Sequence, residues 1–155
     1  MEKENCSLPI VVAEIELSYM PTIKPSARPK IKEQKDVYML FIDTWDKTKI
    51  DLVEQFKVML LNKANRVLGI CTLTTGTVSA TLVDPKQVFS VALKANATQI
   101  ILAHNHPSGQ LAPSTNDYDV TKKLKTIGDL LDLKVLDHLI VTTEGYYSMA
   151  TEGVL

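Results

Sequence analysis

Two histidines, separated by a single residue, lie where an apolar run ends, in QIILAHNH. Alternate residues of a strand point to the same face, so His104 and His106 can aim both imidazole rings at one point. Neutral imidazole is the commonest protein ligand for zinc, and zinc needs three or four ligands. The pair indicates a metal site if further ligands lie nearby. Two hydrogen-bonded or surface histidines would otherwise explain it.

An acidic residue follows at the start of the next expected helix, over 115–131. The apolar stripe of that helix comprises Val120, Leu124, Ile127 and Leu131. Asp117 continues this stripe toward the N-terminus, as does Ser114 one turn earlier. Burying an unpaired carboxylate is expensive, so Asp117 needs a partner. A metal held by the preceding strand would be one.

A capping box offers a rival explanation for the same two residues. Ser114 fits the N-cap position and Asp117 the third helical position, which together satisfy free amides at a helix start. This explains Ser114 and Asp117 without a metal, but it leaves His104 and His106 unexplained. The metal hypothesis explains all four residues with a single site.

Glu54 is a further candidate, in DLVEQFKVMLL. It is in phase with Phe56 and Val58, which form the apolar face of an expected strand, so its carboxylate can face the same side. Alternatively, Glu54 precedes the strand and points to solvent.

The elements that would position these residues alternate along the chain. We expect a helix from Asp36, with Asp36 as its N-cap, and a helix over 85–96 that begins with an Asp84 N-cap and Pro85. Strands are expected over 9–19, 52–62, 66–76, 99–106, 134–143 and 146–149. This order predicts an α/β fold, with a mixed β-sheet flanked by helices.

The chain divides into an arm and a domain. Residues 1–35 are predicted to be an N-terminal strand and a Pro/Lys-rich arm, which is a solvated linker or a contact for nucleic acid or a partner. Residues 36–155 are predicted to form the domain. Cys6 and Cys71 lie in unlike contexts, so no disulfide framework is expected, and the N-terminus lacks a signal-type apolar region. A cytoplasmic location is the expectation.

Composition excludes some functions. The net charge is -1, so no overall field attracts nucleic acid or an anionic membrane. Only Arg28 and Arg66 are arginine among the 17 basic residues, which argues against a surface that reads bases. No apolar stretch is long enough to cross a membrane.

The combined pattern resembles a known family. Glu54, then H-x-H at 104–106, seven residues, Ser114, two residues and Asp117 is the pattern of the JAMM (MPN+) metalloproteases. The surrounding segments AHNHPSG, VLDHLI and GYYS resemble those of the bacterial RadC-like branch of this family. The name of that branch suggests a role in DNA repair. The resemblance runs from about Glu54 to the C-terminus. It implies a cytidine-deaminase-like architecture for the RadC-like JAMM/MPN+ (JAB) domain over 36–155.

The resemblance also implies roles for single residues. His104, His106 and Asp117 would be zinc ligands, with water in the fourth position. Glu54 would be the general base, and Ser114 would hydrogen-bond the oxyanion of the intermediate. Asp137 and His138, in VLDHLI, would be a buried Asp–His pair that orients a loop or a ligand.

The leading functional hypothesis is therefore a zinc-dependent peptidase or isopeptidase that cleaves an amide bond in a peptide or protein. A non-enzymatic MPN-type binding module is one alternative, although such modules have typically lost the ligands that are present here. A protein associated with DNA repair is another, but the balance of acidic and basic residues does not indicate a strongly basic surface of the kind that binds DNA. RadC-like proteins usually carry an N-terminal helix-hairpin-helix region, a feature associated with DNA contact, and we recognise no such region in the residues before Glu54. The identity of the substrate and the oligomeric state are not predicted.

Overall fold

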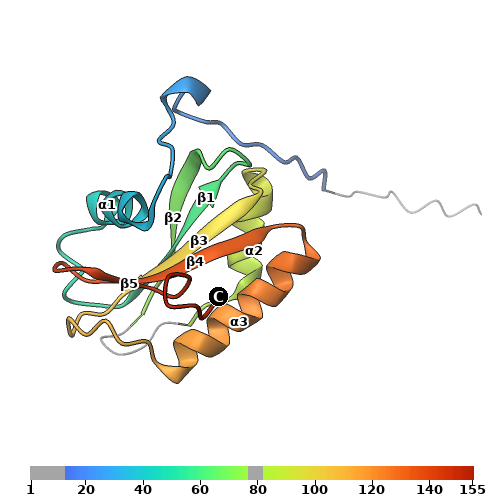
Figure 1. The fold of residues 1–155 in the computed structure, drawn as a ribbon. Helices are drawn as coiled ribbons and strands as arrows, with labels where there is room; N and C mark the ends of the chain where they lie inside the picture. Colours follow the sequence, from blue (N-terminus) through green and yellow to red (C-terminus); the bar gives the residue numbers. More distant parts are fainter. Residues whose placement is uncertain (1–12, 77–81) are drawn as a thin grey trace, which may run out of the picture.

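In the computed structural model of the protein, residues 13–76 and 82–155 are described. One five-stranded sheet forms its centre, with helices on both faces (Figure 1). The elements are η1 (Pro25–Ala27), α1 (Gln34–Thr44), β1 (Gln55–Leu61), β2 (Val67–Thr75), α2 (Pro85–Lys94), β3 (Gln99–Asn105), α3 (Thr115–Leu130), β4 (Lys134–Val141) and β5 (Tyr146–Ser148). The expected mixed sheet flanked by helices is confirmed.

The strands lie in the order β2-β1-β3-β4-β5. Strand β1 is antiparallel to both β2 and β3, whereas β3 and β4 are parallel. Two parallel neighbours need a crossover connection, and α3 supplies it. The residues that enter α3 therefore leave the sheet at the end of β3, where His104 and His106 stand.

The two faces of the sheet carry separate apolar cores. Helix α1 covers one face and helices α2 and α3 cover the other (Figure 1). Along β1 the residues alternate between them, because successive side chains of a strand point to opposite sides. The core under α1 contains Phe41, Trp45, Met59, Leu61, Ile101, Ala103, Leu139 and Val141. The core under α2 and α3 contains Phe56, Val58, Val88, Ala92, Ile100, Leu102, Leu124 and Val135.

Helix ends follow local capping chemistry. The Asp84 side chain accepts a hydrogen bond from the Lys86 amide, so the expected N-cap of α2 is confirmed. The predicted Asp36 N-cap is wrong: Glu33 is the N-cap of α1, and Asp36 lies at the third helical position, where its carboxylate accepts from the Lys32 and Glu33 amides. The capping box therefore spans Glu33 to Asp36, and its N-cap lies three residues before the expected one.

Two further expectations are corrected. Leu131 is 42% exposed because α3 ends at Leu130, one residue before it. Residues 13–19 of the predicted strand at 9–19 form no strand, and Ile15 is 88% exposed; residues 9–12 lie outside the described part. A strand needs a neighbour, and the only pairing in the described arm is a single bridge between Lys30 and Arg66.

A β-bulge shifts the alternation of β4. Ile100 pairs with Val135 and Ile101 with Asp137, so Leu136 is the extra residue on β4. Val135 and His138 consequently face the same side of the sheet although they are three residues apart. No helix in the described ranges is long and apolar enough to cross a membrane.

Candidate metal centre

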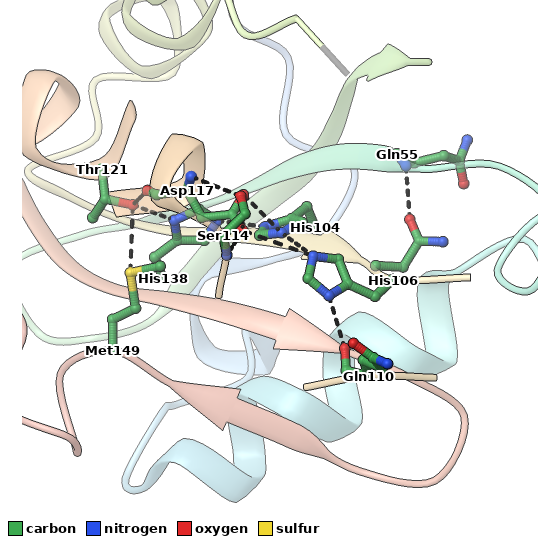
Figure 2. Close-up of polar contacts among 10 residues, drawn as sticks. Gln55, His104, His106, Gln110, Ser114, Asp117, Thr121, His138 and Met149 are labelled. Atoms are coloured by element: carbon green, nitrogen blue, oxygen red, sulfur yellow. Dashed lines mark hydrogen bonds and ion pairs between the residues drawn. The ribbon is translucent and has the colours of Figure 1, made fainter. Parts of the chain in front are cut away.

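Three of the residues singled out in the sequence converge at the end of β3. The Nε2 atoms of His104 and His106 are 2.9 Å apart, and Asp117 Oδ1 is 3.2 Å from His104 Nε2. Asp117 Oδ2 is 3.8 Å from His106 Nε2. One ligand atom from each residue lies within 4.8 Å of the others, a grouping that could hold a metal ion. Figure 2 shows the three side chains pointing toward one another.

The start of α3 fixes the Asp117 carboxylate. Ser114 donates to Asp117 Oδ2 from its main-chain nitrogen at 2.6 Å and from its hydroxyl at 2.7 Å, and the Asp117 amide donates to Ser114 Oγ. The capping box is therefore present, and it anchors Oδ2 while Oδ1 faces His104. Burial raises the pKa of Asp117, but the hydrogen bond and charge of a protonated His104 ring, together with the hydrogen bonds from Ser114, outweigh burial and hold this pKa well below its usual range.

The loop after β3 fixes the His106 ring. His106 Nδ1 lies 2.7 Å from the main-chain oxygen of Gln110. A turn precedes this contact: the Gly109 amide donates to the His106 carbonyl, and Gly109 has a φ of 77°, which glycine adopts without strain. A carbonyl only accepts, so Nδ1 carries a hydrogen; when the ring is neutral, Nε2 therefore presents a lone pair to the other ligands.

The His104 ring is held from its other side by His138. His104 Nδ1 lies 2.8 Å from His138 Nε2, and His138 Nδ1 lies 2.5 Å from Thr121 Oγ1 (Figure 2). The His138 ring is fully buried. Burial and the neighbouring charge of His104 lower the pKa of His138 well below its ordinary value.

Asp137 does not pair with the ring of His138. Its Oδ1 accepts from the main-chain nitrogens of His138 and Ala150, and its Oδ2 accepts from Ser148 Oγ at 2.6 Å. The two residues point to opposite faces because they are neighbours on β4. Asp137 thus contacts the turn after β5, whereas His138 contacts a candidate ligand.

Glu54 lies one residue before β1 and is half-buried. Burial raises the pKa of its carboxyl, the charge of His106 lowers it and the charge of Asp117 raises it. Phe56 pairs with His104 across the sheet, so the chain just before Phe56 lies beside the metal centre.

Asn105, which the sequence analysis did not single out, holds the main chain on both sides of Glu54. Its Oδ1 accepts from the Gln55 amide at 2.7 Å, and its Nδ2 donates to the carbonyls of Ile50 and Val53. Asn105 is fully buried and points to the face opposite His104 and His106. The middle residue of the H-x-H pattern therefore fixes the segment that carries Glu54.

The side chains fit a zinc-type ion. Four ligands about 2.0 to 2.2 Å from one ion in tetrahedral geometry lie about 3.3 to 3.6 Å from one another. The two Nε2 atoms are 2.9 Å apart and Asp117 Oδ1 is 3.2 Å from His104 Nε2, both close to that range. Two imidazoles and a carboxylate form a donor set that zinc accepts. Three protein ligands leave a position open for water or substrate, as a catalytic site requires.

Comparisons with known proteins identify the family of this chain. The family model for the RadC-like JAB domain matches residues 31–154. A UPF0758 protein of Flavobacterium johnsoniae is 48% identical over 101 residues, which are 65% of this chain and 44% of the relative. One of Rubrobacter xylanophilus is 39% identical over 150 residues (94% and 63%), and one of Desulfitobacterium hafniense is 38% identical over 131 residues (84% and 56%).

The sheet, the crossover and the converging side chains define an α/β domain with a candidate metal site. The chain belongs to the RadC-like JAB domain family. The resemblance seen in the sequence is therefore confirmed. The chain spans about half the length of the curated relatives it matches.

Proposed function

We propose that this domain is a zinc-dependent hydrolase that cleaves an amide bond in a peptide or protein. The observation that supports this most directly is the convergence of His104, His106 and Asp117 at the end of β3. The half-buried Glu54 lies just before the segment of β1 that pairs with His104. When bound, a zinc ion supplies Lewis acidity, which polarises a carbonyl and lowers the pKa of water toward about 7. His104, His106 and Asp117 would hold it.

Glu54 is the proposed general base. It would accept a proton from the attacking water and deliver it to the leaving nitrogen. Burial favours this role, because it raises the pKa of the carboxyl and so makes Glu54 a stronger base than an exposed glutamate. The clamp by Asn105 on either side of Glu54 limits how far the carboxylate can drift from the site.

Ser114 is the proposed donor to the oxyanion. In the structure its hydroxyl donates to Asp117 Oδ2, so the hydroxyl must turn away to reach a substrate oxygen. Asp117 Oδ2 would still accept from the Ser114 amide, which keeps one hydrogen bond of the capping box. The cost of the turn is therefore one hydrogen bond, about 0.5 to 1.5 kcal/mol, or more because its acceptor is charged.

The variant Glu54→Gln tests the proposal. It preserves the shape of the side chain and removes the base. We expect zinc content and folding to stay as in the wild type, and amide hydrolysis to fall by about 10²- to 10⁴-fold. The measurement is the appearance of new peptide N-termini, by mass spectrometry, after a peptide library is incubated with zinc-loaded protein.

Exposed Glu144 provides a matched control, since Glu144→Gln removes a carboxylate from a loop outside the site. New termini produced equally by wild type and Glu54→Gln would refute the assigned base. Loss of zinc from Glu54→Gln would instead make Glu54 a ligand. No wild-type cleavage by stoichiometrically zinc-loaded protein would count against an amide hydrolase.

A further inference from the structure

A hydrogen-bonded chain runs from the metal centre into the core and returns to it. It passes from His104 Nδ1 to His138 Nε2 at 2.8 Å, and from His138 Nδ1 to Thr121 Oγ1 at 2.5 Å. Thr121 Oγ1 then contacts the main-chain oxygen of Asp117 at 2.5 Å and Met149 Sδ at 3.5 Å. The chain starts at one candidate ligand and ends on the main chain of another (Figure 2).

The direction of these hydrogen bonds follows from the single proton of the Thr121 hydroxyl. Its contacts with the Asp117 carbonyl and the Met149 thioether are both to groups that only accept, so the proton is used there. Toward His138 the hydroxyl can therefore only accept, and His138 Nδ1 must carry the hydrogen. The Cγ methyl of Thr121 has no such capacity, so the hydroxyl alone sets this direction.

The same reasoning extends to His104. The His138 ring is fully buried and has no carboxylate among its hydrogen-bond partners, so it is held uncharged. With the hydrogen on Nδ1, its Nε2 is an acceptor. His104 Nδ1 must then donate, and in a neutral His104 ring this leaves the lone pair on Nε2, which faces His106 and Asp117. A metal ligand requires that lone pair.

We propose that Thr121 and His138 are positioning residues that fix the tautomer and the orientation of His104 for metal binding. The Thr121 hydroxyl is itself held in place, because it donates a hydrogen bond to the main-chain oxygen of Asp117 one turn earlier in the helix. Asp117 supplies another of the candidate ligands. Two of the three ligands are thus tied into one ring of contacts. This inference rests on the proposed metal site, but not on amide hydrolysis.

Nitrogen-15 NMR of the histidine rings tests the direction of the chain in the wild-type, zinc-loaded protein. We expect His138 to carry its hydrogen on Nδ1 alone. A His138 ring protonated on Nε2, or on both nitrogens, would overturn the inference. This arm needs no variant, and its result does not depend on whether the protein hydrolyses anything.

The matched variants Thr121→Val and Thr121→Ser test the consequence for the metal. Valine keeps the shape and removes the acceptor, whereas serine keeps the acceptor. We expect the zinc Kd, measured by chelator competition, to rise about 10- to 100-fold in Thr121→Val and to stay within about threefold of wild type in Thr121→Ser. Equal zinc affinity in wild type and Thr121→Val, or equal losses in both variants, would overturn the inference.

Discussion

The end of β3 and the adjoining part of β4 carry polar side chains on both faces of the sheet, and the two sets behave differently. Under α1, Asn105 and Asp137 are hydrogen-bonded mainly to main-chain groups, and each polar atom of these side chains has a partner. On the opposite face, His104 and His138 contact other side chains. Neighbours in the sequence, His104 with Asn105 and Asp137 with His138, thus fall into different sets.

The difference separates polar side chains that stabilise the fold from polar side chains that can bind a metal ion. The contacts of Asn105 form what we call a closed set: every polar atom of its side chain is hydrogen-bonded to a main-chain group, and no further partner is needed. The face with His104, His106 and Asp117 is not closed: two ring nitrogens and a carboxylate oxygen point at one another, and a cation satisfies them all. We therefore expect substitutions on the α1 face to cost stability and those on the α3 face to cost metal binding.

The largest effect is expected for His106→Ala. The variant removes one of three protein ligands, so zinc affinity should fall by more than the about 100-fold typical of losing a group that only supports a ligand. Zinc content after dialysis, by elemental analysis, measures this. The metal-free variant should unfold in urea close to wild type, because it relieves the opposed Nε2 atoms.

Gln110→Ala is the matched control for that variant. Gln110 contacts the His106 ring through its main-chain oxygen, which alanine retains. Zinc binding should therefore be unchanged. If His106→Ala kept stoichiometric zinc, the capping box would account for Ser114 and Asp117 without a metal.

An intermediate effect is expected for Asn105→Ala, which tests the closed set. Removal of this side chain leaves the Gln55 amide and the Ile50 and Val53 carbonyls without their partner, and each buried unsatisfied group costs about 1–3 kcal/mol. The free energy of unfolding in urea should fall accordingly, while stoichiometric zinc binding is retained. A variant as stable as wild type, or one that loses zinc as His106→Ala does, would remove the distinction between the faces.

The smallest effect concerns pH. The pKa of His138 is depressed in the folded protein, by burial and then by His104, so the unfolded chain binds a proton first as pH falls below about 6.5. Stability is therefore present above that pH and is lost as pH falls toward the folded pKa, by up to about 1.4 kcal/mol per pH unit. Asp117, whose pKa is also depressed, adds a loss in the same direction below about pH 4.

Urea unfolding of the metal-free protein at pH 7.5 and 5.5 measures this dependence. His138→Gln should flatten the slope between these values, since it removes the group that titrates. An identical slope in the variant would assign the proton uptake to other residues.

Much of the fold could be predicted because the patterns are local. Asp84 and Pro85 mark the start of α2, and the apolar runs mark β1, β3 and β4. The grouping of His104, His106 and Asp117 followed from two periodicities, that of a strand and that of a helix. The start of α1 at Gln34 was missed, because Asp36 occupies a position that also suits an N-cap.

The supporting contacts could not be predicted, because they depend on how distant elements pack. Thr121 looks like an ordinary helix residue until β4 brings His138 beside it. Asn105 appeared only as the spacer between two histidines. The bulge at Leu136 also gives no signal in the sequence, yet it places His138 on the same face as Val135. A strict alternation from Val135 would have put Asp137 there instead.

The crossover from β3 through α3 to β4 has an evolutionary consequence. The three candidate ligands, together with Thr121 and His138, all come from this single continuous stretch, whereas Glu54 comes from a separate strand hairpin. Insertions or deletions around Glu54 can shift it relative to the site and leave the ligand set intact. Inheritance of metal binding and inheritance of catalysis are therefore separable, and a descendant of this domain can lose the second while it retains the first.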